Sequence, residues 1–387
     1  MENFTFYNPV KIIFGKGEIP GVAAQIPETS HVMVLYGGGS IKKNGIHAQV
    51  KDALKNHKVT EFGGIEANPK YETLMKAVEL VKEKDVDFLL AVGGGSVIDG
   101  TKFVAAAALY EGEDPWYMLS KGEKVKAALP VGVVLTLPAT GSEMNAGAVI
   151  NRESTKEKLP FGHPRLFPRF SVLDPEVVYS LPERQVRNGI VDAFVHVMEQ
   201  YLTYPVNAEV QDRWSEGLLN ALVETGPKVL SNQKNYDNAA NLMWEATMAL
   251  NGLVASGVPE DWSTHMIGHE LTALHGIDHA ETLAIVLPGV MQEMRHEKSE
   301  KILQYAARVW GRCCDDNEDM AINDAIEKTE TFFKKMGMKT RLSDHNIGMD
   351  TIKEIVSRLS LRPGFDALGE RESVSPERVR KILESRI

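Results

Sequence analysis

The first half of the chain alternates short apolar runs with amphipathic stretches. Uninterrupted apolar runs at 31–36, 88–92 and 131–137 predict buried strands, because a parallel strand covered on both faces lacks polar alternation. Between the first two runs, residues 70–84 carry apolar side chains at helical spacing, and a second helical stretch follows the glycines at 93–95. The repeated order of strand, turn and helix predicts an open α/β sheet in this half.

The second half has a different pattern. Beyond Pro182 no segment shows the alternation or continuous apolar run of a strand, and helical periodicity dominates. Helices are predicted at 186–203, 210–225, 238–251, 321–336 and 376–387. We therefore expect two domains, an α/β domain at 1–182 and an all-helical domain at 183–387.

Composition fits a globular protein of two domains, with 387 residues, 43% hydrophobic and 25% charged. A formal net charge of −10 argues against nucleic acid as a partner, and no apolar run is long enough to predict a membrane span. The N-terminal residues lack the features of a signal peptide. Cys313 and Cys314 are adjacent and so unsuited to pairing with each other, which favours a reducing cytoplasm.

Glycine-rich segments follow all three predicted strands. They are Gly37-Gly38-Gly39-Ser40, Gly93-Gly94-Gly95-Ser96 and Pro138-Ala139-Thr140-Gly141-Ser142-Glu143. Glycines at the start of a helix let the backbone approach a phosphate, although they also serve as turns that need positive φ. Ligands of open α/β sheets bind beyond the carboxyl ends of the strands, so we expect the three segments to face one crevice.

The first glycine segment favours NADP over NAD. NAD-binding sheets commonly place a carboxylate here to accept the ribose hydroxyls, whereas this segment offers backbone N–H groups, Ser40 and then Lys42 and Lys43. These groups suit a 2′-phosphate. The alternative for the lysines is plain solvation.

The third segment places hydrogen-bonding groups around a turn. Thr136, Thr140, Ser142 and Asn145 could bind phosphate, ribose or carboxamide, or Thr140 or Ser142 could cap a helix that begins near Glu143. The two roles are compatible.

Histidines and an aspartate in the helical half form pairs four residues apart. The pairs are Asp192 with His196, His265 with His269, and His275 with His279. A helix places each pair on one face, and one carboxylate with two or three imidazoles suits Fe, Zn or a similar divalent ion. Single pairs also occur by chance, but three in one apolar region favour a metal site. Neither histidine pair reads H-E-x-x-H, which excludes the usual metalloprotease motif.

The chain resembles the iron-containing (group III) alcohol dehydrogenases over its whole length. The resemblance rests on F-G-K-G at 14–17, G-G-G-S-V-I-D at 93–99, L-P-A-T-G-S-E at 137–143, L-D-P at 173–175, G-I-V-D-A-F-V-H at 189–196 and G-H-E-L-T-A-L-H-G-I-D-H-A at 268–280. The resemblance is strongest to the NADP-dependent butanol dehydrogenase/broad-range aldehyde reductase branch of this family. It implies a dehydroquinate-synthase-like fold, with a Rossmann-like dinucleotide-binding domain, an all-helical metal-binding domain and the cofactor in the cleft.

The resemblance also implies roles for individual residues. The family's metal ligands match Asp192, His196, His265 and His279, and a further histidine near the nicotinamide matches His269. Cofactor contacts match Asn68, Gly94, Gly95, Ser96, Asp99, Thr136, Leu137, Asn145 and Lys158. NAD-preferring relatives carry aspartate where this chain has Gly39, which supports NADP(H). The family's usual T-T-x-G-T-G-S-E is T-L-P-A-T-G-S-E here, so Leu137 could contact a cofactor only by backbone or apolar surface.

The implied reaction is hydride transfer between NADP(H) and a short-chain alcohol–aldehyde pair, with Fe(II) or Zn(II) as Lewis acid. His269 is the candidate for moving the alkoxide proton toward solvent. Family resemblance also favours a homodimer.

The alternative functions are a dehydroquinate-synthase-like lyase and a polyol or glycerol-type dehydrogenase, including glycerol phosphate chemistry. No basic cluster near 265–279 suits a phosphorylated substrate. A non-enzymatic metal-binding protein would leave the glycine turns unexplained.

Overall fold

The computed structural model describes residues 1–312, 317–361 and 367–387, so Cys313 and Cys314 lie outside the described residues. The chain separates into two compact units. A sheet unit comprises Tyr7–Val186 and Asn232–Asn251, and a helical unit comprises Met1–Phe6, Arg187–Ser231 and Gly252–Ile387. These units differ from a single division at residue 182 chiefly because 232–251 groups with the sheet unit.

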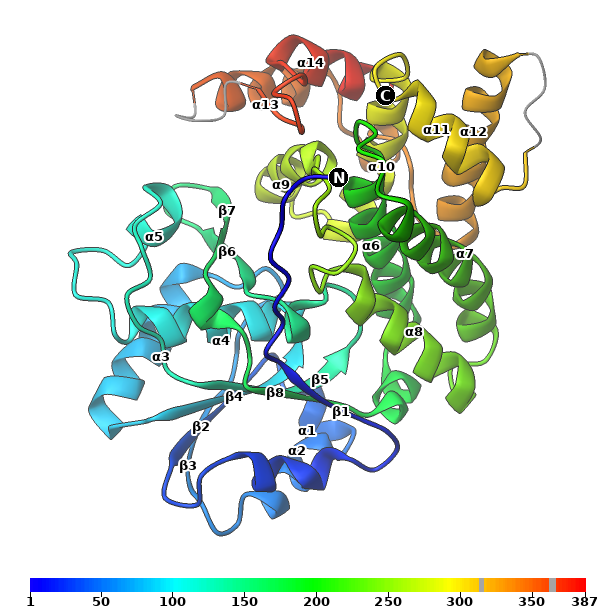
Figure 1. Ribbon diagram of the computed structural model, residues 1–387. Coiled ribbons are helices and arrows are strands. Elements are labelled where there is room, and N and C mark those ends of the chain that lie inside the picture. Colours follow the sequence, from blue (N-terminus) through cyan, green and yellow to red (C-terminus); the bar gives the residue numbers. More distant parts are fainter. Residues whose placement is uncertain (313–316, 362–366) are drawn as a thin grey trace. The chain divides into compact units, whose positions relative to one another are not determined.

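A six-stranded sheet forms the centre of the sheet unit (Figure 1). All its neighbouring strands pair in parallel, in the order β1-β8-β5-β4-β2-β3. Their bounds are β1 Lys11–Phe14, β2 His31–Tyr36, β3 Lys58–Phe62, β4 Phe88–Gly94, β5 Val131–Leu137 and β8 Phe170–Leu173. Every residue of β2 is buried, as expected for a strand covered on both faces. The three strands predicted from apolar runs are confirmed.

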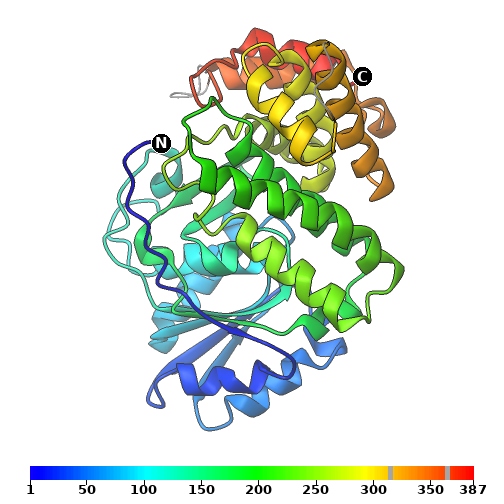
Figure 2. The ribbon, with the colours of Figure 1, turned by 45° about the vertical axis from the view of Figure 1, so that its right-hand side comes forward.

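Helices cover both faces of this sheet. The helices α3 (Tyr71–Lys84) and α4 (Gly95–Ala107) lie on one face, and α1 (Ser40–Lys43) and α2 (Ile46–Ala53) on the other (Figures 1 and 2). The predicted helix at 70–84 is confirmed, and it buries Leu74, Ala77, Val78 and Val81. The remaining elements of this unit are η1 Ile19–Gln25, α5 Tyr117–Ser120, η2 Ser142–Met144, β6 Gly147–Arg152, β7 Glu157–Gly162, η3 Pro164–Leu166, η4 Pro175–Ser180 and α8 Tyr236–Ala249.

The prediction of a helix that begins near Glu143 is wrong. A single 3-10 turn, η2, stands there and leads through the extended Asn145 into β6. The Asn145 side chain explains the stop, because it donates to Gly141 O at 2.9 Å and accepts from Gly147 N at 3.0 Å. Such side-chain bonds to nearby backbone compete with helical ones.

The described part of the helical unit contains helices, several of which contribute apolar residues to one core. Their bounds are α6 Glu183–Tyr201, which begins in the sheet unit, α7 Glu209–Ser231, α9 Ser263–His275, α10 His279–Glu293, α11 Ser299–Arg308, α12 Glu318–Lys335, η5 Ser343–His345, α13 Met349–Leu361 and α14 Pro376–Glu384. Ile267 and Leu271 of α9 pack in one apolar cluster with Ile285 of α10 and Ile382 of α14. The expected architecture, a parallel-sheet part followed by a helical part, is confirmed.

The turn between α9 and α10 sets the position at which α10 begins. Gly276 ends α9 in the left-handed conformation, with φ of 67°, where glycine carries no Cβ penalty. The first residue of α10 is then His279, one of the predicted ligands. Within the described residues, no helix has both the length and the hydropathy for a membrane span.

Candidate active site

The carboxylate of Asp192 lies between two imidazoles in the helical unit. His196, one turn further along α6, places Nε2 at 3.7 Å from Asp192 Oδ1. His279, the first residue of α10, places its own Nε2 at 3.7 Å from the same oxygen. Asp192 and His196 are buried, whereas the His279 side chain is 24% exposed.

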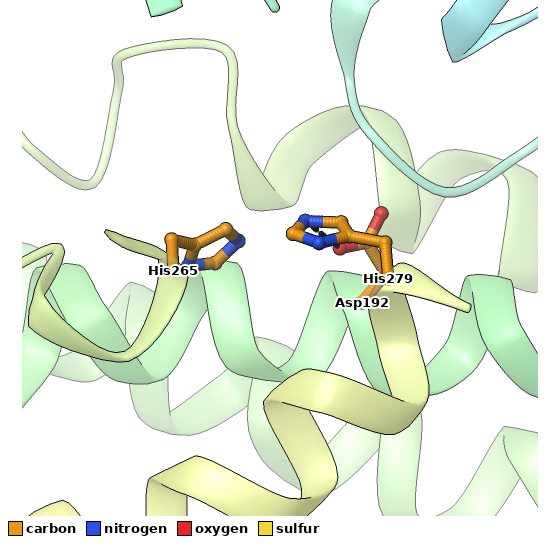
Figure 3. A group of neighbouring side chains, drawn as sticks. All are labelled: Asp192, His265 and His279. Carbon is orange, nitrogen blue, oxygen red and sulfur yellow. Dashed lines mark ion pairs between the residues drawn. The ribbon is translucent and has the colours of Figure 1, made fainter. Parts of the chain in front are cut away.

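The helix α9 adds a third imidazole. The ring of His265 stacks on that of His196, with centroids 4.7 Å apart, and lies 5.2 Å from the ring of His279. One potential ligand atom from each of Asp192, His265 and His279 lies within 4.8 Å of the others, and Figure 3 shows the three side chains converging. The four predicted ligands are therefore brought together by three helices.

This donor set fits a divalent ion. Among the described residues Asp192 Oδ1 is buried and accepts no hydrogen bond. An unsatisfied buried carboxylate oxygen is costly unless a cation compensates it. Ligands at about 2.1 Å from a tetrahedral ion lie roughly 3.4 Å apart, close to the 3.7 Å separations here.

Glu199 fixes the orientation of His265, and sequence reasoning missed it. Its Oε2 accepts from His265 Nδ1 at 2.5 Å and from His265 N at 3.2 Å, while Oε1 accepts from Thr264 N at 2.7 Å. With Nδ1 engaged, Nε2 is the nitrogen left to act as a ligand. Burial and the nearby Asp261 carboxylate raise the pKa of Glu199 to about 8. The spacing Asp192-x₆-Glu199, two helical turns on one face, was the available signal.

Trp262 forms a wall of the same cluster. Its ring centroid lies 5.1 Å from that of His265 and 6.2 Å from that of His196. It holds φ at 61° directly before α9, a left-handed conformation that is uncommon for a bulky residue. Such strain persists where the surrounding structure enforces it.

The two histidines of the predicted pairs that are not proposed ligands, His269 and His275, have different surroundings. His269 is buried, and its ring centroid lies 5.2 Å from that of His279 and 6.3 Å from that of His265. It therefore borders the predicted ligands. His275 is exposed and its Nε2 lies 3.0 Å from Thr351 Oγ1, so the pair of His275 with His279 does not converge on the cluster.

In the sheet unit, the three glycine-rich segments share one edge. They follow β2, β4 and β5, which are neighbours in the sheet and run in parallel. Their carboxyl ends therefore lie together, as expected for a ligand-binding edge. The predicted contacts Gly37, Gly38, Gly39, Ser40, Gly94, Gly95, Ser96, Thr136 and Leu137 all belong to these strand ends or the turns after them.

Two glycines of the second segment permit a very close approach. A Cβ on Gly94 would lie 2.9 Å from Leu137 Cβ, and one on Gly95 would lie 2.4 Å from Thr140 Oγ1 and Cγ2. Only glycine lets these two turns meet without displacement. This explains the glycines of G-G-G-S by packing between the turns, alongside any phosphate contact.

Asn68 links two other predicted cofactor contacts, Ser96 and Lys158. Its backbone N donates to Ser96 Oγ at 3.3 Å, and its Oδ1 accepts from Lys158 Nζ at 3.0 Å. It holds φ at 62°, which asparagine tolerates better than most residues. Sequence positions 68, 96 and 158 are thus joined at this edge.

Asp99 and Asn145 are braced by a lysine that sequence reasoning missed. Lys102 Nζ donates to Ser142 Oγ at 2.8 Å, Asn145 Oδ1 at 3.1 Å and Gly147 O at 2.8 Å. Asp99 Oδ1 accepts from Ser142 Oγ at 2.6 Å, and its Oδ2 accepts from Val149 N at 2.9 Å. Burial lowers the pKa of Lys102 to about 8 and raises the pKa of Asp99. Asp99 therefore supports the turn from behind.

An acidic residue lies near the first glycine segment, Gly37–Ser40, although the segment itself contains none. Glu61, on the adjacent β3, lies 4.0 Å from Lys42 Nζ and 3.0 Å from His47 Nε2, and accepts from Tyr36 Oη at 3.3 Å. The segment itself carries no acid, but a neighbouring strand supplies one, which local inspection of the sequence could not reveal. Gly39 has φ of 92°, and a Cβ there would meet no atom within 4 Å.

Comparisons with known proteins agree across the whole chain. The family model for iron-containing alcohol dehydrogenase matches residues 9–175, and the model for its C-terminal part matches residues 187–385. The NADPH-dependent aldehyde reductase YqhD of Escherichia coli K12 is 54% identical over the full length of both chains. Its crystal structure gives a TM-score of 0.98 over 100% of this chain and 99% of that one. A probable NADH-dependent butanol dehydrogenase of Bacillus subtilis is 40% identical over the full length of both.

Proposed function

The chain belongs to the iron-containing alcohol dehydrogenase family and is an alcohol dehydrogenase/aldehyde reductase, and we propose that it reduces short-chain aldehydes with NADPH at a divalent metal centre. The proposal of a metal centre rests on the convergence of Asp192, His265 and His279, with His196 beside them. The relatives' names divide between NADPH and NADH. The choice of NADPH therefore rests on the first glycine segment.

The side chains of the helical unit would organise the substrate oxygen. We propose Asp192, His196, His265 and His279 as the ligands of Fe(II) or Zn(II), which both accept this donor set. When bound, the ion supplies Lewis acidity and the nicotinamide supplies hydride chemistry. Glu199 holds the His265 ring in place by accepting from Nδ1, and Trp262 covers the imidazoles of His196 and His265.

His269 is proposed to move the substrate proton. It lies beside His279 without belonging to the set of proposed ligands. An imidazole exchanges protons near neutral pH, so it can donate to the product alkoxide during aldehyde reduction and accept in the reverse direction.

The turns of the sheet unit are proposed to hold the cofactor. Gly94, Gly95 and Ser96 begin α4, where unpaired backbone N–H groups suit the pyrophosphate. Gly37–Ser40 would receive the 2′-phosphate, and Asn68 with Lys158 would contact the cofactor beyond the second turn. Thr136, Leu137 and Asn145 would line the side toward β5, with Asp99 behind them.

The test follows NADPH absorbance with butyraldehyde before and after chelation, and again after Fe(II) or Zn(II) is restored. Aldehyde-dependent NADPH loss that disappears with chelation and returns with metal is the expected result. Turnover that survives complete metal removal would overturn the ligand roles. No aldehyde-dependent loss of NADPH or NADH with either metal restored would contradict the reductase and leave the lyase alternative.

The NADPH preference has its own test. Gly39→Asp should lower kcat/KM for NADPH by about tenfold or more relative to NADH, because it adds a carboxylate near the proposed phosphate. Gly45 also has positive φ, of 86°, and open space around its Cβ position. Gly45→Asp therefore carries the same backbone strain and serves as control. An unchanged NADPH to NADH ratio in Gly39→Asp would contradict the placement of the 2′-phosphate.

A homodimer in the cytoplasm completes the proposal. Sedimentation at low protein concentration should give twice the 42.8 kDa chain mass. Fractionation of the producing cells should recover the chain with cytoplasmic markers. A monomer that retains full activity would contradict the dimer.

A further inference from the structure

A buried lysine lies behind the proposed metal ligands. Lys298, immediately before α11, is 3% exposed. Its ammonium donates to Asp261 Oδ2 at 2.8 Å, to both oxygens of Glu370 at 2.9 Å and to Leu202 O at 2.6 Å. Buried lysines are rare without such pairing, and none of these partners is a proposed ligand.

Two of the contacts hold the helices that carry the ligands. Leu202 comes directly after the C-terminal end of α6, which bears Asp192 and His196. Asp261 precedes α9, which bears His265, and its Oδ1 accepts from Ser263 N at 2.9 Å. The ammonium of Lys298 therefore bridges the end of one ligand-bearing helix to the start of another.

Glu199 makes a second connection between α6 and the start of α9. Asp261 N donates to Glu199 O at 2.9 Å, and the Glu199 carboxylate accepts from Thr264 N and from His265. Between Asp261 and Ser263 stands Trp262 in its left-handed conformation. Asp261 thus fixes the strained residue whose ring covers His196 and His265.

Glu370 extends the bridge to the C-terminal part of the chain. It lies between Leu368 and Val374, which pair with each other in an isolated bridge. At the adjoining Gly369, with φ of 85°, a Cβ would lie 3.1 Å from Asp261 Oδ2. This segment therefore packs directly against the aspartate that Lys298 holds.

We propose that Lys298 is a positioning residue of the metal centre, which sets the separation of the ligands on α6 and α9 by joining Leu202, Asp261 and Glu370. The proposal rests on the proposed function, because it needs an ion bound at Asp192, His196, His265 and His279. It assigns Lys298 no contact with substrate or ion.

The experiment measures metal binding rather than turnover. Chelator-treated full-length chain is titrated with Co(II), recording the d–d absorption spectrum, and Zn(II) affinity is measured by competition with a chromophoric chelator. Lys298→Met should bind Zn(II) about 10- to 100-fold more weakly and give a shifted Co(II) spectrum, as expected when support of a ligand is lost. Glu370→Gln, which keeps the pair of Lys298 with Asp261, should show a smaller change in the same direction.

Lys301→Met is the matched control. Lys301 is 5% exposed, lies one turn further along α11 and pairs with Asp212. Its loss should lower thermal stability comparably while leaving the Co(II) spectrum and Zn(II) affinity unchanged. Equal effects in both lysine variants, or none in Lys298→Met, would overturn the proposal. If Lys298→Met does not fold, Glu370→Gln decides, since wild-type affinity and spectrum there would overturn it. A wild-type chain that binds neither ion refutes the metal centre itself.

Discussion

At the residue scale, the proposed metal centre depends on side chains that hold one another in place. Asp192 shares one oxygen between His196 and His279, and Glu199 engages Nδ1 of His265. A bound imidazole keeps its ring orientation when its other nitrogen donates to a carboxylate. The ligands and their supports are therefore expected to respond differently to substitution.

Glu199→Gln tests the support. Glu199 uses both carboxyl oxygens as acceptors, one for Thr264 N and the other for His265 Nδ1. The amide keeps only one acceptor oxygen, so the two hydrogen bonds cannot both be made and Zn(II) affinity should fall about 10- to 100-fold. Competition with a chromophoric chelator measures the change. Glu260→Gln is the control, because Glu260 accepts from Trp262 Nε1 rather than from His265. Equal Zn(II) affinity of Glu199→Gln and wild type would show that the hydrogen bond does not support binding.

His269→Ala tests the proposed proton transfer. General acid–base groups contribute about 10²- to 10⁴-fold, so kcat for butyraldehyde reduction should drop by at least that lower bound near neutral pH. The metal content, measured by elemental analysis, should stay that of the wild type. His275→Ala, at the exposed histidine on the same helix, should leave kcat unchanged. Full activity of His269→Ala across the pH range would remove the role.

At the scale of elements, the sheet unit joins its predicted cofactor turns by close backbone approach. The helix α4 begins at Gly95, directly after β4, and meets Thr140 of the turn after β5. Any side chain at position 95 must push the two turns apart. The glycine therefore couples the phosphate turn to its neighbour.

Gly95→Ala should weaken NADPH binding by about tenfold or more and lower the free energy of unfolding by about 1–3 kcal/mol, the usual cost of overpacking. Fluorescence titration with NADPH and denaturant unfolding measure the two effects. Gly21→Ala in η1, where a Cβ would meet only Glu18 Oε2 at an ordinary 3.8 Å, should change neither appreciably. Wild-type NADPH affinity in Gly95→Ala would mean that the turns can shift without consequence for the cofactor.

The elements also show how far the sequence could predict this protein. The uninterrupted apolar run at 31–36 and the helical periodicity of 70–84 were sufficient, because burial on both faces of a strand or on one face of a helix leaves a visible pattern. The turn at Ser142–Met144 was misread because the Asn145 side chain ends it, a local competition that periodicity does not register. Glu61 and Lys102 were missed because only the folded chain brings their partners close. The spacing of Glu199 from Asp192 places both on one helical face, but its partner His265 lies on another helix.

At the scale of the whole chain, the C-terminal residues return to α12 and to the segment that follows it. Arg386, just beyond α14, donates from Nη2 to Thr340 O at 2.8 Å and lies 3.0 Å from Glu330 Oε2 on α12. Thr340 Oγ1 donates to Glu330 Oε1 at 3.0 Å, and Lys334 Nζ lies 3.0 Å from the same oxygen. One carboxylate thus ties α12, the segment at Thr340 and the chain end together.

These contacts of Glu330 should make α14 less stable as the pH falls. Burial alone would raise the pKa of Glu330, but the hydrogen bond from Lys334, the charge of Arg386 and the hydroxyl of Thr340 lower it from 4.5 to about 2. A carboxyl whose folded pKa is depressed contributes stability above its unfolded pKa and loses it as pH falls through the folded one. The contribution is at most about 3 kcal/mol at neutral pH, reduced by solvent screening, and should decline between pH 4.5 and 2.

Glu330→Gln should therefore reduce amide protection in α14 strongly at pH 7 and much less at pH 3, where wild type has lost a large part of the same contribution. Hydrogen exchange of residues 376–384, corrected for the intrinsic pH dependence of exchange, gives the comparison. Glu377→Gln, whose pair with Arg380 is on the surface with a side chain 60% exposed, should have little effect at either pH. A protection loss in Glu330→Gln that is equal at the two pH values would show that the carboxylate charge does not hold the chain end. The stabilisation would then belong to packing of Val379, Ile382 and Leu383 against the core, which does not titrate.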